Sequence, residues 1–164
     1  MSIGVYPGSF DPLTIAHLTI ARCAVEQLGL SRIDLAISRT TLGKAHLDDD
    51  SIERRRLAIE RAAATRAWLG VVVVDASLVA EIALGYDAVV MGADKWAQVT
   101  DPAWYGGDPV ARDAAVAALP RVAVAPRGGI AVPAGLLLDV PAHVAEVSAS
   151  AVRNGRTDWA APPD

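Results

Sequence analysis

The residues best suited to chemistry lie in one short stretch near the N-terminus. An apolar run is followed by Gly8, Ser9 and Phe10 and then, on the opening turn of a predicted helix, by Thr14 and His17. Thr14 and His17 are three residues apart, so a helix presents both on one face. Backbone amides at a helix start attract anions, and phosphate is the natural occupant. An imidazolium at His17 could then stabilise negative charge growing on a phosphoryl group.

This stretch differs from two familiar phosphate-binding patterns. The chain contains neither Gly-x-Gly-x-x-Gly nor Gly-x-x-x-x-Gly-Lys followed by Ser or Thr. A turn followed by a helix is also a common way to end a strand, and a single histidine is often structural. The stretch alone therefore predicts a phosphate site and leaves a structural interpretation open.

Further groups that could bind phosphate lie elsewhere in the chain. Ser148 and Ser150 precede Arg153 at a predicted helix start, where hydroxyls and a guanidinium fork can contact phosphate oxygens. Lys44 follows the second predicted strand and could neutralise a phosphate. A capped helix and a solvated lysine are the structural alternatives.

An acidic residue and two tryptophans follow the fourth predicted strand. Asp94 stands where a parallel sheet opens its crevice, so it could accept a hydrogen bond from a ribose hydroxyl. The indoles of Trp96 and Trp104 suit a flat, electron-poor ring. Since the chain has four Trp but one Phe and three Tyr, the indoles could instead supply core area.

Short apolar runs alternate with longer amphipathic stretches, which predicts βαβ units with parallel strands. The predicted fold is α/β: a Rossmann-like, doubly wound, five-stranded parallel sheet. The predicted strands cover residues 3–6, 33–37, 71–74, 88–91 and 122–125. The predicted helices cover residues 14–28, 51–67 (capped by Ser51), 77–84 and 111–119.

Length and composition indicate one domain over residues 1–164, with a tail at about 157–164. Of the 164 residues, 52% are hydrophobic and 21% charged, which excludes disorder. The net charge of −4 argues against a nucleic-acid or anionic-membrane partner. No apolar run reaches the ~20 residues of a membrane-spanning helix.

Cysteine use and the N-terminus predict a cytoplasmic protein. The single Cys23 excludes an internal disulfide framework and suits a reducing compartment. The first residues show no secretion signal. The chain also lacks Cys/His spacing typical of a metal site, so no metal-ligating residues are predicted.

Residues 4–18, GVYPGSFDPLTIAHL, resemble the first signature of nucleotidyltransferases with an [HT]-x-G-H motif. These include the phosphopantetheine and the nicotinate or nicotinamide mononucleotide adenylyltransferases. The resemblance implies transfer of a nucleotidyl group from a nucleoside triphosphate to a phosphorylated small-molecule acceptor, with release of pyrophosphate and with Mg²⁺ held mainly through the ATP phosphates. Thr14 fills the first motif position and His17 the last. Ala16 replaces the glycine and adds a methyl where the triphosphate passes.

Two later segments resemble other parts of this family. EVSASAVRNG, residues 146–155, is similar to I-S-S-T-x-I-R, with Ala149 in place of one hydroxyl. The resemblance implies that Ser148, Ser150 and Arg153 bind the triphosphate. Lys44 precedes a segment similar to the family's Ser-x-Glu-x-Arg helix start, which implies that it holds the reacting phosphates.

The acceptor is indicated by the segment after the fourth strand. Gly92 to Asp94 and the later Trp104 resemble the G-x-D and Trp of pyridine-mononucleotide adenylyltransferases, in which the Trp stacks on the pyridine ring. This implies that Trp104, with Trp96 as a second candidate, binds the acceptor, and that Asp94 lines the nucleotide cleft with Gly8, Ser9 and Phe10. The Arg-Gly-x-Arg segment of phosphopantetheine enzymes is missing.

The leading interpretation is therefore an adenylyltransferase of NAD biosynthesis that acts on nicotinate or nicotinamide mononucleotide. One alternative is a nucleotidyltransferase that uses ATP or CTP and another acceptor, such as pantetheine phosphate or a sugar phosphate. The other is a non-catalytic, nucleotide-binding regulatory module. Each of these is compatible with a homo-oligomer.

Overall fold

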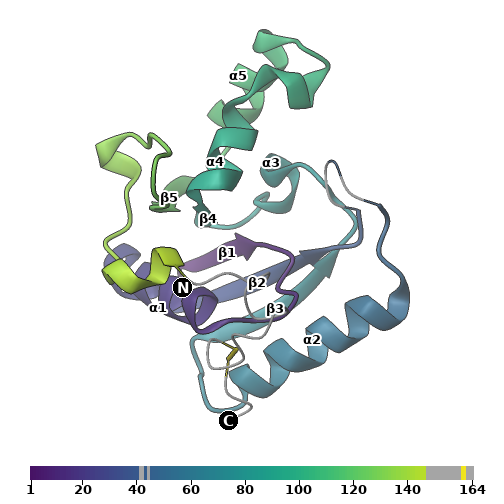
Figure 1. The fold of residues 1–164 in the computed structure, drawn as a ribbon, viewed down its shortest axis with the longest axis vertical. Coiled ribbons are helices and arrows are strands. Elements are labelled where there is room, and N and C mark those ends of the chain that lie inside the picture. Colours follow the sequence, from purple (N-terminus) through teal and green to yellow (C-terminus); the bar gives the residue numbers. More distant parts are fainter. Residues whose placement is uncertain (41–42, 44, 147–159, 162–164) are drawn as a thin grey trace.

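Five parallel strands form a single sheet in the order β3-β2-β1-β4-β5 (Figure 1). The structure is a computed structural model that describes residues 1–40, 43, 45–146 and 160–161. The strands are β1 (Ile3–Pro7), β2 (Arg32–Ser38), β3 (Leu69–Val74), β4 (Ala88–Gly92) and β5 (Arg121–Ala125). The predicted parallel sheet and all five of its strands are confirmed.

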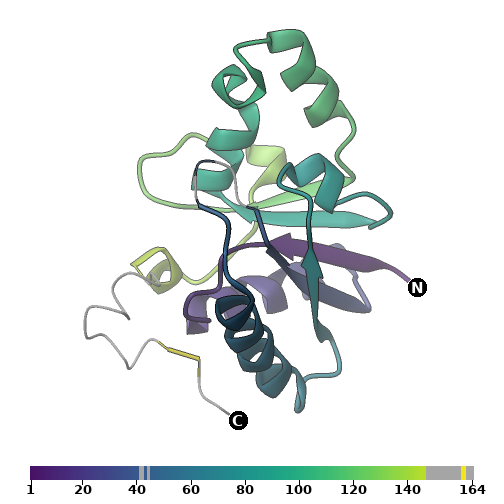
Figure 2. The ribbon, with the colours of Figure 1, turned by 90° about the vertical axis from the view of Figure 1, so that its right-hand side faces the viewer.

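Helices cover both faces of this sheet, as Figures 1 and 2 show. One face packs against α1 (Ile15–Leu28), α2 (Asp49–Ala63) and the 3-10 turn η3 (Ala142–Glu146). The other packs against α3 (Val79–Ile82) and α4 (Ala93–Thr100). The chain then continues through η1 (Pro102–Tyr105) and α5 (Pro109–Ala117), and η2 (Ala134–Leu136) follows β5.

The strands are buried on both faces, which explains their continuous apolar runs. Tyr6 and Leu35 belong to the core beneath α1 and α2, whereas their neighbours Val5 and Ala36 belong to the core beneath α3 and α4. This alternation follows from the two-residue period of a strand. It confirms the doubly wound architecture.

The order of the strands places a crevice between β1 and β4. From β1 the chain builds outward through β2 to β3, and it then returns to lay β4 on the other side of β1. Ligands of open parallel sheets bind at the carboxyl ends of the strands beside such a reversal. Gly8 follows β1 and Asp94 follows β4, so both flank this point.

Several helix boundaries differ from the sequence expectation. The helix expected over residues 51–67 covers Asp49–Ala63, and its cap is Asp48 rather than Ser51. The Asp48 carboxylate accepts a hydrogen bond from the Ser51 amide at 2.7 Å, and its negative charge also suits a helix start. The helices expected over 77–84 and 111–119 cover Val79–Ile82 and Pro109–Ala117.

Helix α4 was not predicted at all. It is eight residues long, and a pattern that spans little more than two turns is hard to recognise in sequence. Of the helices that the structure describes, none is long and apolar enough to span a membrane.

Candidate active site

A sharp turn carries the chain from β1 to α1. The Gly8 amide donates to the Ala36 carbonyl at 3.1 Å, which ties the turn to β2. Phe10 has a φ of 46° and is 2% exposed, and a Cβ at Gly8 would lie 2.8 Å from its Cζ. Glycine is therefore required where the Phe10 ring tucks beneath the backbone. The Phe10 side chain lies in the hydrophobic core. Its contact with a nucleotide stays a prediction, and it would have to be made by the backbone.

Thr14 and His17 form a reciprocal cap at the start of α1. The Thr14 Oγ1 accepts from the His17 amide at 3.3 Å, and the His17 Nδ1 accepts from the Thr14 amide at 3.0 Å. A backbone N–H can only donate, so this contact assigns the lone pair to Nδ1 and the ring hydrogen to Nε2. The two side chains share one face, as their spacing predicts.

The imidazole of His17 is neutral at pH 7. Burial lowers the pKa of His17 to about 4. Its ring centroid lies 5.0 Å from that of Phe10 and 6.2 Å from that of Tyr6, and burial raises the pKa of the Tyr6 phenol. The imidazolium expected from the sequence is therefore wrong, because an apolar cage disfavours the charged ring. His17 offers phosphate a neutral Nε2–H donor.

The lowered pKa of His17 makes stability depend on pH. In the unfolded chain its pKa is about 6.5, so that state binds a proton between about pH 6.5 and 4 while the folded state does not. Stability is fully present above that range and falls as the pH drops through it, by about 2 kcal/mol at about pH 5. Urea unfolding near pH 7.5 and near pH 5 should show this fall in the free energy of unfolding of the wild type. The fall should be smaller in His17→Gln. An equal fall in both proteins would contradict it.

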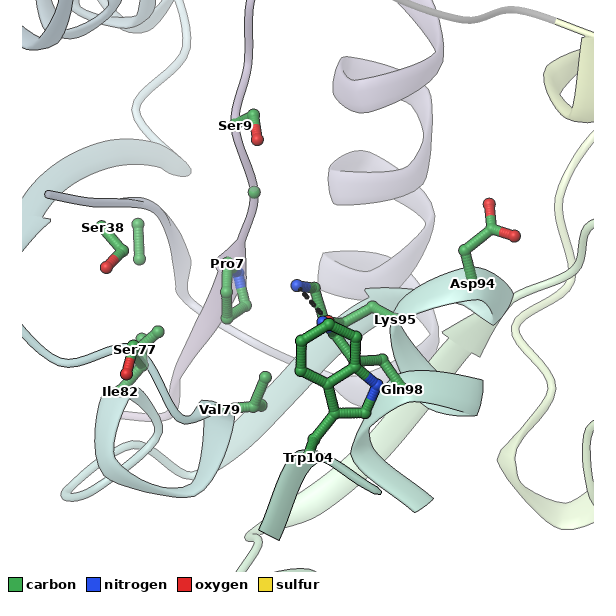
Figure 3. Close-up of a pocket in the computed structure, with 12 residues that line it drawn as sticks. Pro7, Ser9, Ser38, Ser77, Val79, Ile82, Asp94, Lys95, Gln98 and Trp104 are labelled. Carbon is green, nitrogen blue, oxygen red and sulfur yellow. Dashed lines mark hydrogen bonds between the residues drawn. The ribbon is translucent and has the colours of Figure 1, made fainter. Parts of the chain in front are cut away.

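Two neighbouring pockets open at the carboxyl ends of the strands. The histidine pocket, of about 100 Å³, includes Thr14, His17 and Arg127 in its lining. The tryptophan pocket, of about 390 Å³, is lined by Pro7, Gly8, Ser9, Ala36, Ser38, Ser77, Val79, Ile82, Asp94, Lys95, Gln98 and Trp104 (Figure 3). Asp94 lines both pockets, so they adjoin each other at this residue.

Asp94 is paired with a cation that the sequence analysis missed. Its Oδ2 lies 2.8 Å from Nη1 of Arg127, which lines the histidine pocket. Arg127 closely follows β5, and this position past the carboxyl end of a strand could have identified it as a candidate site residue from the sequence. The pair sets a carboxylate beside a guanidinium where the pockets join.

The two candidate tryptophans lie in different places. Trp104 lines the tryptophan pocket, and a Cβ at Gly43 would lie 2.7 Å from its Cη2, so the indole packs against the loop after β2. Trp96 lines a separate surface pocket with Thr100 and Arg112. Its predicted place in the acceptor site is wrong. Two helical positions after Asp94, its side chain points around the helix to another face.

A buried arginine supports the first turn from beneath. Nη1 of Arg55 donates to the Ser9 carbonyl at 3.1 Å, and Nη2 lies 3.1 Å from Oδ2 of Asp11. Arg55 is 8% exposed and comes from α2, 44 residues after Asp11. It ends the Ser-x-Glu-x-Arg pattern, but nothing in that pattern says what its side chain contacts.

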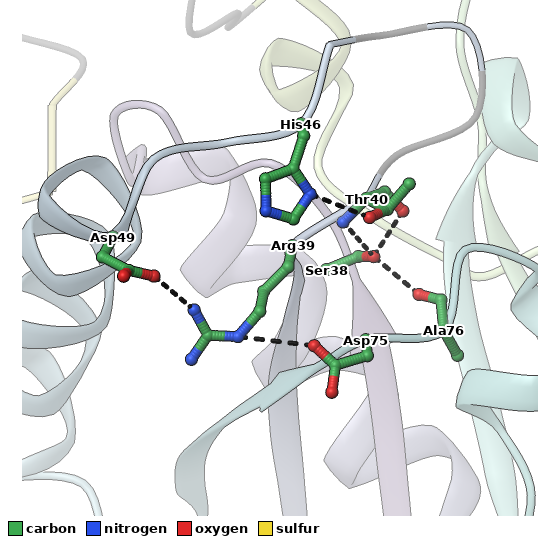
Figure 4. A network of polar contacts seen from close by, with 7 residues as sticks. All are labelled: Ser38, Arg39, Thr40, His46, Asp49, Asp75 and Ala76. Carbon is green, nitrogen blue, oxygen red and sulfur yellow. Dashed lines mark hydrogen bonds and ion pairs between the residues drawn. The ribbon is translucent and has the colours of Figure 1, made fainter.

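A polar network links the residues around the end of β2 to the start of α2 and to the segment after β3 (Figure 4). The Arg39 guanidinium bridges Asp49 at 2.9 Å and Asp75 at 3.4 Å. The Ser38 hydroxyl contacts the Ala76 carbonyl at 2.6 Å, which fixes one wall of the tryptophan pocket. His46 is exposed and contacts Thr40, so it lies at the surface.

Four predicted site residues, Lys44, Ser148, Ser150 and Arg153, lie outside the described residues. The described chain on either side of residues 147–159 lies near the start of α1. Val144 lines the histidine pocket, while Ala160 pairs with Thr14 and the Ala161 amide donates to Leu13 at 3.0 Å. The tail expected at 157–164 thus includes two residues in backbone contact with α1's N-terminal flank. Across the described ranges, no three His, Cys, Asp or Glu cluster to hold a metal ion.

Comparison with solved structures identifies the fold. Two structures of Plasmodium falciparum nicotinic acid mononucleotide adenylyltransferase, one complexed with NaAD and one with APC, superpose with TM-scores of 0.59 and 0.58. Each is 16% identical, and each match covers 93% of this chain and 82% of the other. No curated protein matches the chain.

The family follows from a different comparison, made on sequence. The model of the family described as Cytidylyltransferase-like matches residues 5–155. That range begins in β1, includes Thr14 and His17, and extends through Arg153, so it covers all but the first residue of the two signature segments on which the resemblance rests. Together with the five-stranded sheet and the paired pockets at its reversal point, this match shows that the chain belongs to the cytidylyltransferase-like family and is a nucleotidyltransferase.

Proposed function

We propose that this nucleotidyltransferase moves AMP from Mg·ATP to nicotinate or nicotinamide mononucleotide and releases pyrophosphate. The observation that carries the proposal is the meeting of two pockets at Asp94, one containing His17 and the other Trp104. An indole suits a pyridine ring, and a helix start suits phosphate. The structural relatives, named as nicotinic acid mononucleotide adenylyltransferases, favour the same acceptor class.

The reaction is an in-line displacement in which position and charge do most of the work. An oxygen of the acceptor phosphate attacks the α-phosphorus of ATP. A bond forms between them, the bond to the β-phosphate oxygen breaks, and pyrophosphate leaves with the electron pair. Nε2–H of His17 donates to the phosphate oxygens, where negative charge grows. The backbone of Gly8 and Ser9 lies at the wall of the acceptor pocket.

The remaining phosphate contacts are assigned to Lys44, Ser148, Ser150 and Arg153. Lys44 would hold the reacting phosphates together, and Arg153 would stabilise the leaving pyrophosphate. Support comes from Val144 and Ala160, since these described residues on either side of the Arg153 segment both lie by the start of α1.

Magnesium would be held mainly by the ATP phosphates. Among the described residues that line the two pockets, Asp94 is the one carboxylate, a group that Mg²⁺ accepts as a ligand. When bound, the ion would shield the phosphate charge. The protein's part is to place Asp94 and Arg127 at the junction of the pockets. We place the reaction in the cytoplasm because the one thiol, Cys23, suits a reducing compartment.

A pyrophosphate-release assay over a panel of substrates tests the proposal. We expect release with ATP plus a pyridine mononucleotide, and little release when CTP replaces ATP. If pyrophosphate is released with pantetheine phosphate or a sugar phosphate but not with a pyridine mononucleotide, the enzyme uses another acceptor. ATP binding without release for any acceptor would instead favour a regulatory module.

Changing Trp104 should damage acceptor binding specifically. We expect Trp104→Ala to raise KM for the mononucleotide about tenfold, since stacking of a ring on an indole stabilises binding by about 1–3 kcal/mol. KM for ATP should change little, because Trp104 does not line the histidine pocket. Steady-state kinetics with each substrate varied in turn measures both constants. Trp96→Ala is the matched control, and equal effects of the two changes would remove Trp104 from the site.

A further inference from the structure

Helix α4 presents a positively charged side chain to the tryptophan pocket. Lys95 and Gln98 are three residues apart and both line this pocket (Figure 3). The Lys95 Nζ donates to the Gln98 Oε1 at 2.8 Å, which directs the ammonium along the pocket side of the helix. The family resemblance assigns no role to either residue.

The tryptophan pocket contains one negative and one positive side chain among its described residues. Among the described residues of its lining, Asp94 and Lys95 are charged. The Asp94 carboxylate pairs with Arg127, which belongs to the histidine pocket. Gln98 is neutral, so this hydrogen bond orients the Lys95 ammonium and itself adds no opposing charge. The acceptor side therefore presents a cation.

The walls around this cation are largely apolar. Pro7, Ala36, Val79 and Ile82 line the same pocket, and all four are buried. A bound ring would displace water from these walls, and an ion pair is stronger where water is displaced. Lys95 is thus placed to distinguish a ligand with a negative charge from a neutral ligand of the same shape.

We propose that Lys95, oriented by Gln98, makes nicotinate mononucleotide the preferred acceptor over nicotinamide mononucleotide. This inference rests on the proposed function. The two acceptors differ at one substituent of the pyridine ring, a carboxylate in one and a neutral amide in the other. An ammonium gains a charge-assisted hydrogen bond from the carboxylate, whereas the amide offers only a carbonyl oxygen.

The arrangement of the elements favours the ring substituent over the acceptor phosphate as the partner of Lys95. Lys95 and Trp104 come from α4 and η1, which are consecutive in the chain, so the cation belongs to the same wall as the ring-binding indole. The phosphate must reach the α-phosphorus near His17, in the other pocket. Gly8 and Ser9, which follow β1, line the tryptophan pocket.

The test compares kcat/KM for the two mononucleotides, with ATP as the donor, in wild type and Lys95→Met. We expect the wild type to prefer nicotinate mononucleotide. The variant should lose about 10- to 100-fold with this acceptor and change by less than about threefold with nicotinamide mononucleotide. Lys95→Arg should keep most of the preference because it keeps the charge. Arg61→Met removes an exposed charge from α2, outside the pocket lining, and should change neither value.

Other results would overturn the inference. An equal loss with both acceptors would mean that Lys95 serves the phosphate they share, and an unchanged preference would mean that it serves neither. Calorimetric titration of each mononucleotide, with a non-hydrolysable ATP analogue present, separates this inference from the proposed function. Lys95-dependent preference in binding without turnover would reject adenylyl transfer and keep the assignment of Lys95. Binding of neither mononucleotide would reject both.

Discussion

His17→Ala should lower kcat by about 100- to 1000-fold while KM for ATP changes little. The imidazole is held by the Thr14 amide at Nδ1, so Nε2–H is pre-oriented before substrate arrives. A donor that is already in place stabilises the transition state at no cost of reorganisation. Steady-state kinetics of pyrophosphate release measures both constants.

The controls for this variant separate chemistry from folding. His17 is also part of the helix cap, so His17→Ala should lose about 1 kcal/mol of stability, measured by urea unfolding. His17→Gln keeps an N–H donor and should recover part of the lost kcat. His46→Ala changes an exposed histidine and should leave kcat near the wild-type value. An unchanged kcat in His17→Ala would remove the ring from the mechanism.

Arg55→Met should lower both stability and activity. Removing the guanidinium leaves the Ser9 carbonyl without this donor and takes away the ion pair with Asp11. Removing one partner of a buried ion pair costs about 3–5 kcal/mol of stability. Because Asp11 is partly exposed, we expect a loss of about 3 kcal/mol for Arg55→Met. Because the same contacts hold the turn between β1 and α1, kcat should fall about tenfold or more in the protein that stays folded.

The adjacent residue provides a matched control. Arg56 lies on the solvent side of α2 and pairs with Glu53 and Glu60. Arg56→Met should therefore change stability little and leave kcat unchanged. Urea unfolding and kinetics at low temperature, where Arg55→Met remains folded, give both quantities. Loss of stability with normal kcat would show that the turn keeps its shape without Arg55.

The strands and the helix-start pair were readable from the chain because their signals are local. Buried parallel strands need continuous apolar runs, and all five runs became strands. Thr14 and His17 share a face because three residues nearly complete one helical turn. Helix α4 was missed because its eight residues span little more than two turns, too few for a repeating apolar pattern to stand out.

Tertiary contacts, some of them between distant segments, account for what the chain order did not reveal. Tyr6 and Phe10 enclose His17, and the resulting loss of hydration, which no spacing rule reports, makes its imidazole neutral. Arg55 reaches the first turn from another helix, and Arg127 reaches Asp94 across 33 residues. Periodicity selects which face of an element is apolar, so it could predict the sheet and the pairing of Thr14 with His17. Protonation and pocket membership depend on which faces meet, and those are set by packing in three dimensions.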